Sequence, residues 1–370
     1  MKKIFFWILV GLTGFIFLRE IYLHKELYFS SYDSLYWEER YLNSQWVKGW
    51  EAKEKMGDAE LYAYAGWRQI KGDDPTKINP EVPPFGKYLI GFSIIIFGNP
   101  YVLSLILGFL YLWVIFILGR RILGSNTLTM ISLLLFTLDP LFRENLSTSM
   151  LDLPFSLFIS LAFLSLLKGK ESKIFYLLSV IFLGLVAATK FYLVGFALVG
   201  VFFFYLFLVL IFKKKKDVFW FLSFLPFFAL IYFANYIVYF LSGHNLLDFK
   251  YLHFWIRHFA RVQVEEYPKG EILRILLLGK WRIWWDGGGI VGIASWRPWW
   301  ALGFLSIFPS IFGAISKKNL EILLLCLWPV SLLVIFFVGV PYPRYLLPIL
   351  PPLYILLCYN LKRLILEWGK

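Results

Sequence analysis

The chain has 370 residues, of which 59% are hydrophobic and only 16% charged, and its formal net charge is +13 at pH 7. Its mean hydropathy of +0.68 excludes a soluble globular enzyme and a disordered chain, because too few polar residues are present to cover a water-exposed surface. The two cysteines, Cys326 and Cys358, both lie in apolar runs, which excludes a disulfide scaffold. The composition predicts a multi-span membrane protein.

Apolar runs close to the length of one membrane crossing recur along the chain. The first follows Met1-Lys2-Lys3 and is succeeded by Arg19-Glu20 without a small-residue cleavage site, so we expect a retained span instead of a signal peptide. Residues 174–212 contain no polar loop and are twice one crossing long, which predicts a hairpin of two spans. The ten predicted spans are 4–18, 101–119, 127–142, 148–167, 174–190, 191–212, 218–241, 298–315, 320–339 and 343–361.

The distribution of charge predicts the orientation of these spans. Ten spans place both termini on one face, whose loops hold 16 basic residues against four acidic ones, while the other face holds 21 basic and 20 acidic residues. Lysine and arginine concentrate in cytoplasmic loops, so we expect both termini to be cytoplasmic and the protein to lie in the cell membrane. The basic balance is then a topology signal, and nucleic-acid binding is not expected. Lys213–Lys216 is interpreted as a stop signal that can also touch anionic lipid.

We expect an all-α fold with a single multi-span membrane domain, 1–370, in which two long outer loops, 20–87 and 242–297, form the active-site face. Helical spacing of apolar residues in 33–50 predicts an interfacial helix, and the apolar stretch 88–97 is too short to span. Tryptophans crowd the second loop, where they indicate either an aromatic belt or a face that stacks on a sugar ring. They are Trp281, Trp284, Trp285, Trp296, Trp299 and Trp300.

Several charged residues on the predicted outer face have both a structural and a chemical interpretation. Asp58 and Glu60 suit the start of a helix, but a carboxylate at the membrane surface can also take a proton from an acceptor hydroxyl. Asp152 falls inside a predicted span, where an ionised carboxylate is costly without a partner, and Arg143 is the nearest cation in the sequence. A structural ion pair between these two residues is one interpretation.

Three further cations complete this set. Lys87 suits a lysine that reaches up to the interface. Lys190 lies between two predicted spans that no polar loop separates. A charged ammonium there favours pairing with an anionic group that arrives along the membrane, such as a lipid phosphate. Arg344 at the start of the last span is either a helix-end anchor or a fork for a phosphate. Carboxylates and cations on one face suit attack by a hydroxyl on a lipid-phosphate-linked group, with the cations stabilising the phosphate as it leaves.

The sequence contains only weak signals for nucleotide or metal binding. Neither G-x-x-x-x-G-K-[ST] nor G-x-G-x-x-G before a helix occurs, and Gly287-Gly288-Gly289 is a flexible turn or a weak phosphate loop. The four histidines form no closely spaced ligand set, so neither a cofactor nor a metal site is predicted. A divalent cation is left open, although no ligand cluster supports one.

Five motifs occur in a specific order: "GDAELYAYA" at 57–65, "PPFGK" at 83–87 before a short helix ending in "FGNP", "LDPLFRENLSTSMLD" at 138–152, "GLVAATK" at 184–190 and "YPRYLLPILPP" at 342–352. With them the chain resembles the membrane-embedded glycosyltransferases of the GT-C fold. Within that fold it is similar to the dolichyl-phosphate-mannose–protein mannosyltransferases and the lipid A aminoarabinose transferases. The resemblance implies an inverting transferase that takes mannose or another hexose from a polyprenyl-phosphate carrier on the extracytoplasmic face.

The resemblance also implies roles for individual residues. Asp58 matches the first-loop carboxylate that acts as general base, and Lys190 and Arg344 fall at basic positions that would meet the donor phosphate. We add Lys87 and Arg143 to the expected phosphate-binding residues, and Glu60 and Asp152 as acceptor-contacting or site-shaping residues.

The chain departs from the mannosyltransferase pattern at two positions. Ala59 follows Asp58 where those enzymes usually have Asp-Glu, and Val82 replaces the histidine before the Pro-Pro pair. The acceptor hydroxyl is therefore left open among protein Ser/Thr, a glycan and a lipid. The alternative function is a transporter or flippase for polyprenyl-linked glycans, which is less favoured because no inverted repeat is evident.

Overall fold

The computed structural model describes residues 2–212, 215–265, 267–283 and 288–368, which are mostly helical. The first part forms α1 (Lys2–Leu23), α2 (Lys25–Phe29), α3 (Ser34–Leu42), α4 (Gln45–Lys48), the 3₁₀ helix η1 (Gly49–Glu51), α5 (Asp58–Ile70) and α6 (Phe85–Phe97). The middle forms α7 (Val102–Leu123), α8 (Asn126–Thr137), α9 (Pro140–Leu146), α10 (Asp152–Lys168), α11 (Ile174–Thr189) and α12 (Tyr192–Phe212).

The second half of the chain begins with a broken helix and a long outer segment. It contains α13 (Lys215–Phe224), α14 (Pro226–Ala234), α15 (Ile237–Leu241), α16 (Leu246–Glu265), α17 (Glu271–Leu278), β1 (Lys280–Ile283) and β2 (Gly289–Gly292). The last elements are α18 (Pro298–Leu305), α19 (Ile307–Ser316), α20 (Leu320–Phe337), the 3₁₀ helix η2 (Pro343–Leu346) and α21 (Leu350–Trp368).

Within the described ranges, six helical segments are long and apolar enough to cross a membrane. These are Lys3–Leu23, Val102–Leu123, Tyr192–Ile211, Asp217–Ala234, Pro298–Ser316 and Leu320–Phe337. Each coincides with a predicted span. Shorter apolar helices occupy two further predicted spans, as α8 and α11, and the predicted short helix, as α6. The helical, multi-pass character of the chain is therefore supported, while the count of ten crossings stays a prediction.

Two predicted spans are interrupted instead of continuous. Residues 218–241 form α13, α14 and α15, with the first break before Pro226. Residues 298–315 form α18 and α19, which meet at Ser306. Pro309 has no N–H for the carbonyl four residues earlier, at Leu305, so one hydrogen bond of a continuous helix is missing at this turn.

Two other predicted spans have different ends. The helix predicted over 127–142 stops at Thr137, because the carboxylate of Asp139 accepts a hydrogen bond from the Leu141 N–H at 2.9 Å and so caps α9, with Pro140 at its first position. The span predicted over 343–361 opens with η2, and its α-helix begins only at Leu350.

The all-α expectation was wrong for one short segment. β1 and β2 pair antiparallel, with Lys280 opposite Gly292 and Ile283 opposite Gly289. Aromatic and β-branched residues favour strands, and both strands carry them. Trp284, Trp285 and Gly287, which the sequence singled out, lie outside the described residues.

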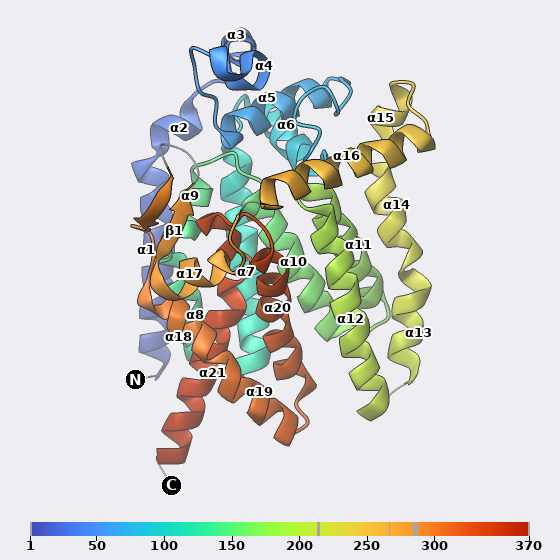
Figure 1. Ribbon diagram of the computed structural model, residues 1–370. Coiled ribbons are helices and arrows are strands. Elements are labelled where there is room, and N and C mark those ends of the chain that lie inside the picture. The colour runs from blue at the N-terminus through green and yellow to red at the C-terminus, as the bar shows by residue number, and fades with distance from the viewer. Residues whose placement is uncertain (1, 213–214, 266, 284–287, 369–370) are drawn as a thin grey trace.

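The long helices run side by side between two ends of the molecule (Figure 1). α1 begins and α21 ends at the lower end of this view, whereas α3, α4, α5 and α6 gather at the upper end, and α16 lies across the tops of α11 and α12. α10 forms the centre of the core, since nearly all its residues are buried. The predicted first outer loop and the start of α10 thus meet at one end of the bundle.

Candidate active site

Asp58 is the first residue of α5. The helix begins here because the backbone N–H of Gly57 donates to Oε2 of Glu60 at 3.0 Å, one half of a capping box. The Asp58 side chain is 34% exposed. α5 therefore presents a partly exposed carboxylate at the upper end of the molecule.

Asp152 and Lys190 form a buried ion pair beneath it. Nζ of Lys190 lies 2.6 Å from Oδ1 of Asp152, and both side chains are only 2% exposed. Asp152 begins α10, and Lys190 occupies the turn between α11 and α12. A buried charge is tolerated only when it is paired, and these two opposite charges pair with each other. The sequence suggested Arg143 as the partner of Asp152, and that interpretation was wrong.

Arg344 joins this pair to Asp58. Its Nη2 lies 2.6 Å from Oδ2 of Asp58, and its Nε lies 3.6 Å from Oδ2 of Asp152. The result is an alternating chain of charges from Asp58 through Arg344 and Asp152 to Lys190. We call these four residues the charge chain. They come from α5, η2, α10 and the α11–α12 turn, so the site exists only when these elements pack together.

Two tyrosines beside Arg344 hold the cations in place. The Arg344 guanidinium carbon lies 4.2 Å from the centre of the Tyr342 ring, and Nζ of Lys190 lies 4.6 Å from the centre of the Tyr345 ring. Such cation–π contacts stabilise a charge that is shielded from water. Sequence reasoning missed both tyrosines, although aromatic residues close on either side of Arg344 were the available signal.

Arg344 remains charged in this environment. Its guanidinium lies between the carboxylates of Asp58 and Asp152, and two such neighbours favour the charged form. An arginine with a fixed charge and a planar fork of donors suits a phosphate oxygen pair better than a lysine does.

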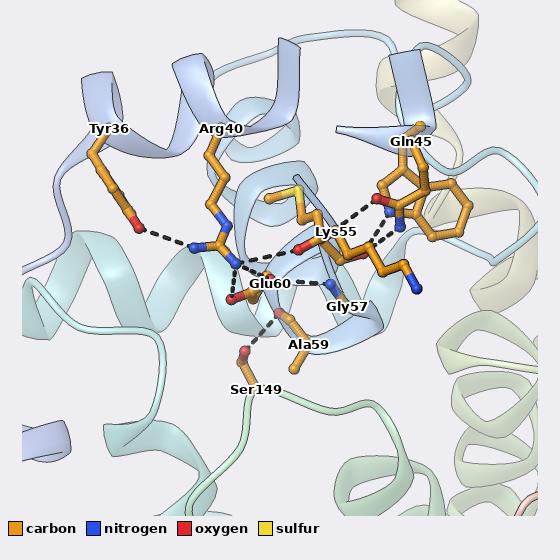
Figure 2. A network of polar contacts seen from close by, with 10 residues as sticks. Tyr36, Arg40, Gln45, Lys55, Gly57, Ala59, Glu60 and Ser149 are labelled. Carbon is orange, nitrogen blue, oxygen red and sulfur yellow. Dashed lines mark hydrogen bonds and ion pairs between the residues drawn. The ribbon is translucent and has the colours of Figure 1, made fainter. Parts of the chain in front are cut away.

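Glu60 belongs to a separate network that anchors the start of α5 (Figure 2). Its carboxylate lies 3.0 Å from Nη2 of Arg40 on α3, whose Nη1 donates to the Tyr36 hydroxyl at 3.0 Å. The Ser149 hydroxyl donates to the Ala59 carbonyl at 2.7 Å and joins the segment before α10 to α5. These contacts fix the start of α5, and the acceptor-contacting or site-shaping role of Glu60 stays a prediction.

Glu60→Ala should therefore lower stability before it affects chemistry. We expect the loss of the cap and of the Arg40 contact to reduce the free energy of unfolding by about 1 kcal/mol. Arg40→Ala should produce a similar loss, and the double variant should lose less than the sum, because the two side chains share one interaction. Thermal unfolding of the four proteins in one detergent measures this. Fully additive losses would contradict the shared network.

Lys87 and Glu81 are both hydrogen-bonded to Asn79. Lys87, fully buried on α6, donates to the carbonyls of Asn79 at 2.7 Å and Val82 at 2.8 Å. Burial raises the pKa of Glu81, while Lys87 and Asn79 oppose the rise and the negative charge of Asp58 adds to it. Sequence reasoning passed over Glu81, whose place just before the Pro-Pro pair was the only signal. The phosphate role predicted for Lys87 stays a prediction.

Arg143 faces a different part of the molecule. Its Nη1 lies 3.0 Å from Oε1 of Glu20, a residue of α1 whose side chain is only 6% exposed. The short helix α9 contacts α1, which turns Arg143 toward that helix. The contact ties α9 to α1, and the phosphate role predicted for Arg143 also stays a prediction.

Three of the tryptophans that the sequence singled out donate hydrogen bonds inside the protein. Trp300 is fully buried and donates to Oδ2 of Asp139 at 2.6 Å, so it cannot offer a face to a sugar. Trp281 donates to the Pro341 carbonyl at 2.9 Å and attaches the hairpin to the segment that leads to Arg344. Trp296 donates to the Leu276 carbonyl at 3.1 Å. Burial overturns the sugar-stacking interpretation for Trp300, while for the half-buried Trp281 and Trp296 both sequence interpretations stay predictions.

His244 and His253 pair with residues outside the charge chain. His244 lies 2.7 Å from Oδ2 of Asp74, and His253 lies 2.6 Å from the Tyr232 hydroxyl. Among the residues that the structure describes, no group of three or more His, Cys, Asp or Glu side chains is placed to hold a metal ion.

The helical bundle has the fold of the GT-C membrane glycosyltransferases, and the resemblance inferred from the motifs is confirmed at this level. The structure is similar to that of ArnT from Cupriavidus metallidurans bound to undecaprenyl phosphate, with a TM-score of 0.62 and 19% identity over 85% of this chain and 57% of ArnT. It is also similar to the apo oligosaccharyltransferase of Archaeoglobus fulgidus, with a TM-score of 0.57 and 13% identity over 98% of this chain and 51% of that protein.

A third similar structure is the Archaeoglobus fulgidus oligosaccharyltransferase AglB in complex with an inhibitory peptide and a dolichol-phosphate, with a TM-score of 0.51 and 13% identity. No family model and no curated protein matches the sequence. The chain spans little more than half the length of these solved structures. At such identities the likeness concerns the fold alone.

Proposed function

We propose that this chain is an inverting glycosyltransferase that moves mannose or another hexose from a polyprenyl-phosphate carrier to the hydroxyl of a protein Ser/Thr, a glycan or a lipid. The observation that carries the proposal is the charge chain. In it the partly exposed carboxylate of Asp58 pairs with Arg344, and the buried carboxylate of Asp152 contacts both Arg344 and Lys190. The similar folds of ArnT and AglB, solved with undecaprenyl phosphate and with a dolichol-phosphate, support the same class of donor.

The charge chain suits a phosphate ligand for an electrostatic reason. Its two carboxylates and two cations have no net charge, and Arg344 is shared between Asp58 and Asp152. A donor phosphodiester brings one negative charge and competes with Asp58 for Arg344. When Arg344 turns to the phosphate, Asp58 loses its cationic partner, and its carboxylate oxygen becomes available to the proton of the acceptor hydroxyl. Donor binding would thus release Asp58 from its ion pair so that it can act as the base.

The proposed transfer is one displacement at the anomeric carbon. The acceptor oxygen forms a bond to that carbon, the bond from the carbon to the phosphate oxygen breaks, and the hydroxyl proton passes to Asp58. The configuration inverts because attack occurs opposite the leaving group. The leaving polyprenyl phosphate gains a second negative charge, which Arg344 and Lys190 stabilise more strongly than the charge of the donor. Asp152 keeps both cations in position.

The proposal includes the predicted topology. Ten crossings, cytoplasmic termini and a single domain in the cell membrane would place residues 20–87 and 242–297 on the extracytoplasmic side together with the charge chain. The positive-inside distribution of the loops supports this orientation. The partners would then be a polyprenyl-phosphate sugar, an acceptor on the outer face and the surrounding lipids, with no cofactor assigned.

The direct test uses the purified full chain in nanodiscs with radiolabelled polyprenyl-phosphate-mannose, and with a glucose-carrying donor in parallel. We expect time-dependent release of label from the lipid into a water-soluble, peptide or acceptor-lipid product. The initial rate should rise with donor concentration and then saturate, because transfer requires the donor phosphate to be bound at Arg344 and Lys190 and each protein has one such site. Donor binding is measured separately on the same preparations.

Two outcomes would count against the proposal. Donor binding without release for any supplied acceptor, together with movement of the carrier across a vesicle membrane, would favour the flippase alternative. An absence of binding for every polyprenyl-phosphate sugar tried would remove the phosphate role of Lys190 and Arg344.

A further inference from the structure

A second cationic site lies at the opposite end of α7 and α10. A cavity of about 490 Å³ is lined by Trp113, Phe116, Ile117, Arg120, Arg121 and Lys168. Asp152 begins α10 and Lys168 ends it, so the two charged ends are separated by about 24 Å at 1.5 Å per residue. That separation approaches the thickness of a hydrocarbon core of about 30 Å. The cavity is therefore remote from the charge chain, near the other membrane interface.

The three cations of this cavity differ in whether they pair with a carboxylate. Arg121 pairs with Glu171 and lies 3.0 Å from Oε1 of Glu321, so two carboxylates already neutralise it. Among the described residues, no carboxylate lies within 4 Å of Arg120 or Lys168. Arg120 is exposed, and Nζ of Lys168 lies 5.3 Å from the centre of the Phe175 ring. Two positive charges thus remain available on adjacent helices.

The walls of the cavity are apolar. Trp113 and Phe116 stack with their ring centres 6.2 Å apart, and Trp113 remains 57% exposed. Both residues precede Arg120 on α7 by one to two turns, so their rings lie on the side of the cations that leads toward the middle of the helix. A ligand that fits this surface has an anionic head beside Arg120 and Lys168 and an apolar body along Trp113.

We propose that this cavity binds the phosphate of an anionic glycerophospholipid from the surrounding leaflet, with its acyl chains along Trp113 and Phe116. Basic pockets between membrane helices on the cytoplasmic side are suited to such head groups. The bound phosphate bridges Arg120 on α7 and Lys168 on α10 and stabilises the packing of these two helices. The lipid is not a substrate, and the inference is independent of the proposed transfer reaction.

The test compares phosphatidylglycerol with phosphatidylcholine of identical acyl chains on the purified full chain in detergent. We expect native mass spectrometry to show preferential retention of phosphatidylglycerol, and this lipid alone to raise the thermal unfolding midpoint. The variant Arg120→Gln/Lys168→Gln should weaken the apparent affinity for phosphatidylglycerol at least fivefold. The matched control is Lys170→Gln/Lys173→Gln, which removes two exposed charges from the neighbouring loop and should change the affinity less than twofold.

Three results would overturn the proposal. Equal retention of the two lipids by the wild-type protein would exclude an anionic-lipid site, and this comparison holds even if the double variant fails to fold. Equal losses in the cavity variant and the control variant would indicate a general surface potential. Displacement of the lipid by inorganic phosphate at equal concentration would identify a phosphate-only site without a role for the apolar wall.

Discussion

Asp58→Asn is expected to reduce sugar transfer by about 10²- to 10⁴-fold, the contribution typical of a general base. Asparagine has almost the same shape as aspartate but cannot take the acceptor proton. Donor binding should persist, because Arg344 and Lys190 keep their places through Asp152. The measurement is the initial rate of label release from the polyprenyl-phosphate sugar, beside donor binding on the same sample.

The matched control for this variant is Asp33→Asn. The Asp33 carboxylate caps α3 by accepting from the N–H groups of Leu35 and Tyr36 at 3.0 and 3.2 Å, and asparagine caps helices equally well. The control should transfer sugar at the wild-type rate. A fully active Asp58→Asn enzyme would contradict the assignment of the base, whereas equal losses in both variants would point to a shared structural defect.

Lys190→Met should have the largest effect on stability. It leaves Asp152 buried without its closest partner, and breaking a buried ion pair typically costs 3–5 kcal/mol. The double variant Asp152→Asn/Lys190→Met removes both charges, so we expect it to recover most of the lost stability. Transfer should stay low in both variants, with a larger loss of donor affinity than of acceptor affinity. Thermal unfolding and donor and acceptor titrations measure the two effects separately.

The two readouts distinguish a structural lysine from one that binds phosphate. If the double variant regained both stability and transfer, Lys190 would serve only to neutralise Asp152. The control Lys71→Met removes a cation that lies 3.6 Å from the centre of the Trp67 ring, away from the charge chain, and should leave donor affinity unchanged.

Much of the fold could be predicted because membrane insertion is governed by local properties. Hydropathy over about twenty residues marks a span regardless of what packs beside it, and six predicted spans coincide with helices long and apolar enough to cross a membrane. The breaks inside two spans were harder to predict from the sequence. Pro226 and Pro309 were visible in the sequence, but proline is tolerated within some membrane helices, as Pro329 is in α20.

The sequence by itself determined the class of protein, the apolar segments and the charged residues that are costly to bury. It named Asp58, Asp152, Lys190 and Arg344 because ionised groups near a membrane need partners or ligands. Only the tertiary structure decided which groups are partners. Arg344 meets Asp58 across 286 positions, and Asp152 pairs with Lys190 instead of Arg143 because α9 directs Arg143 to Glu20 on α1. Such pairings depend on how whole helices pack, and no local pattern records that packing.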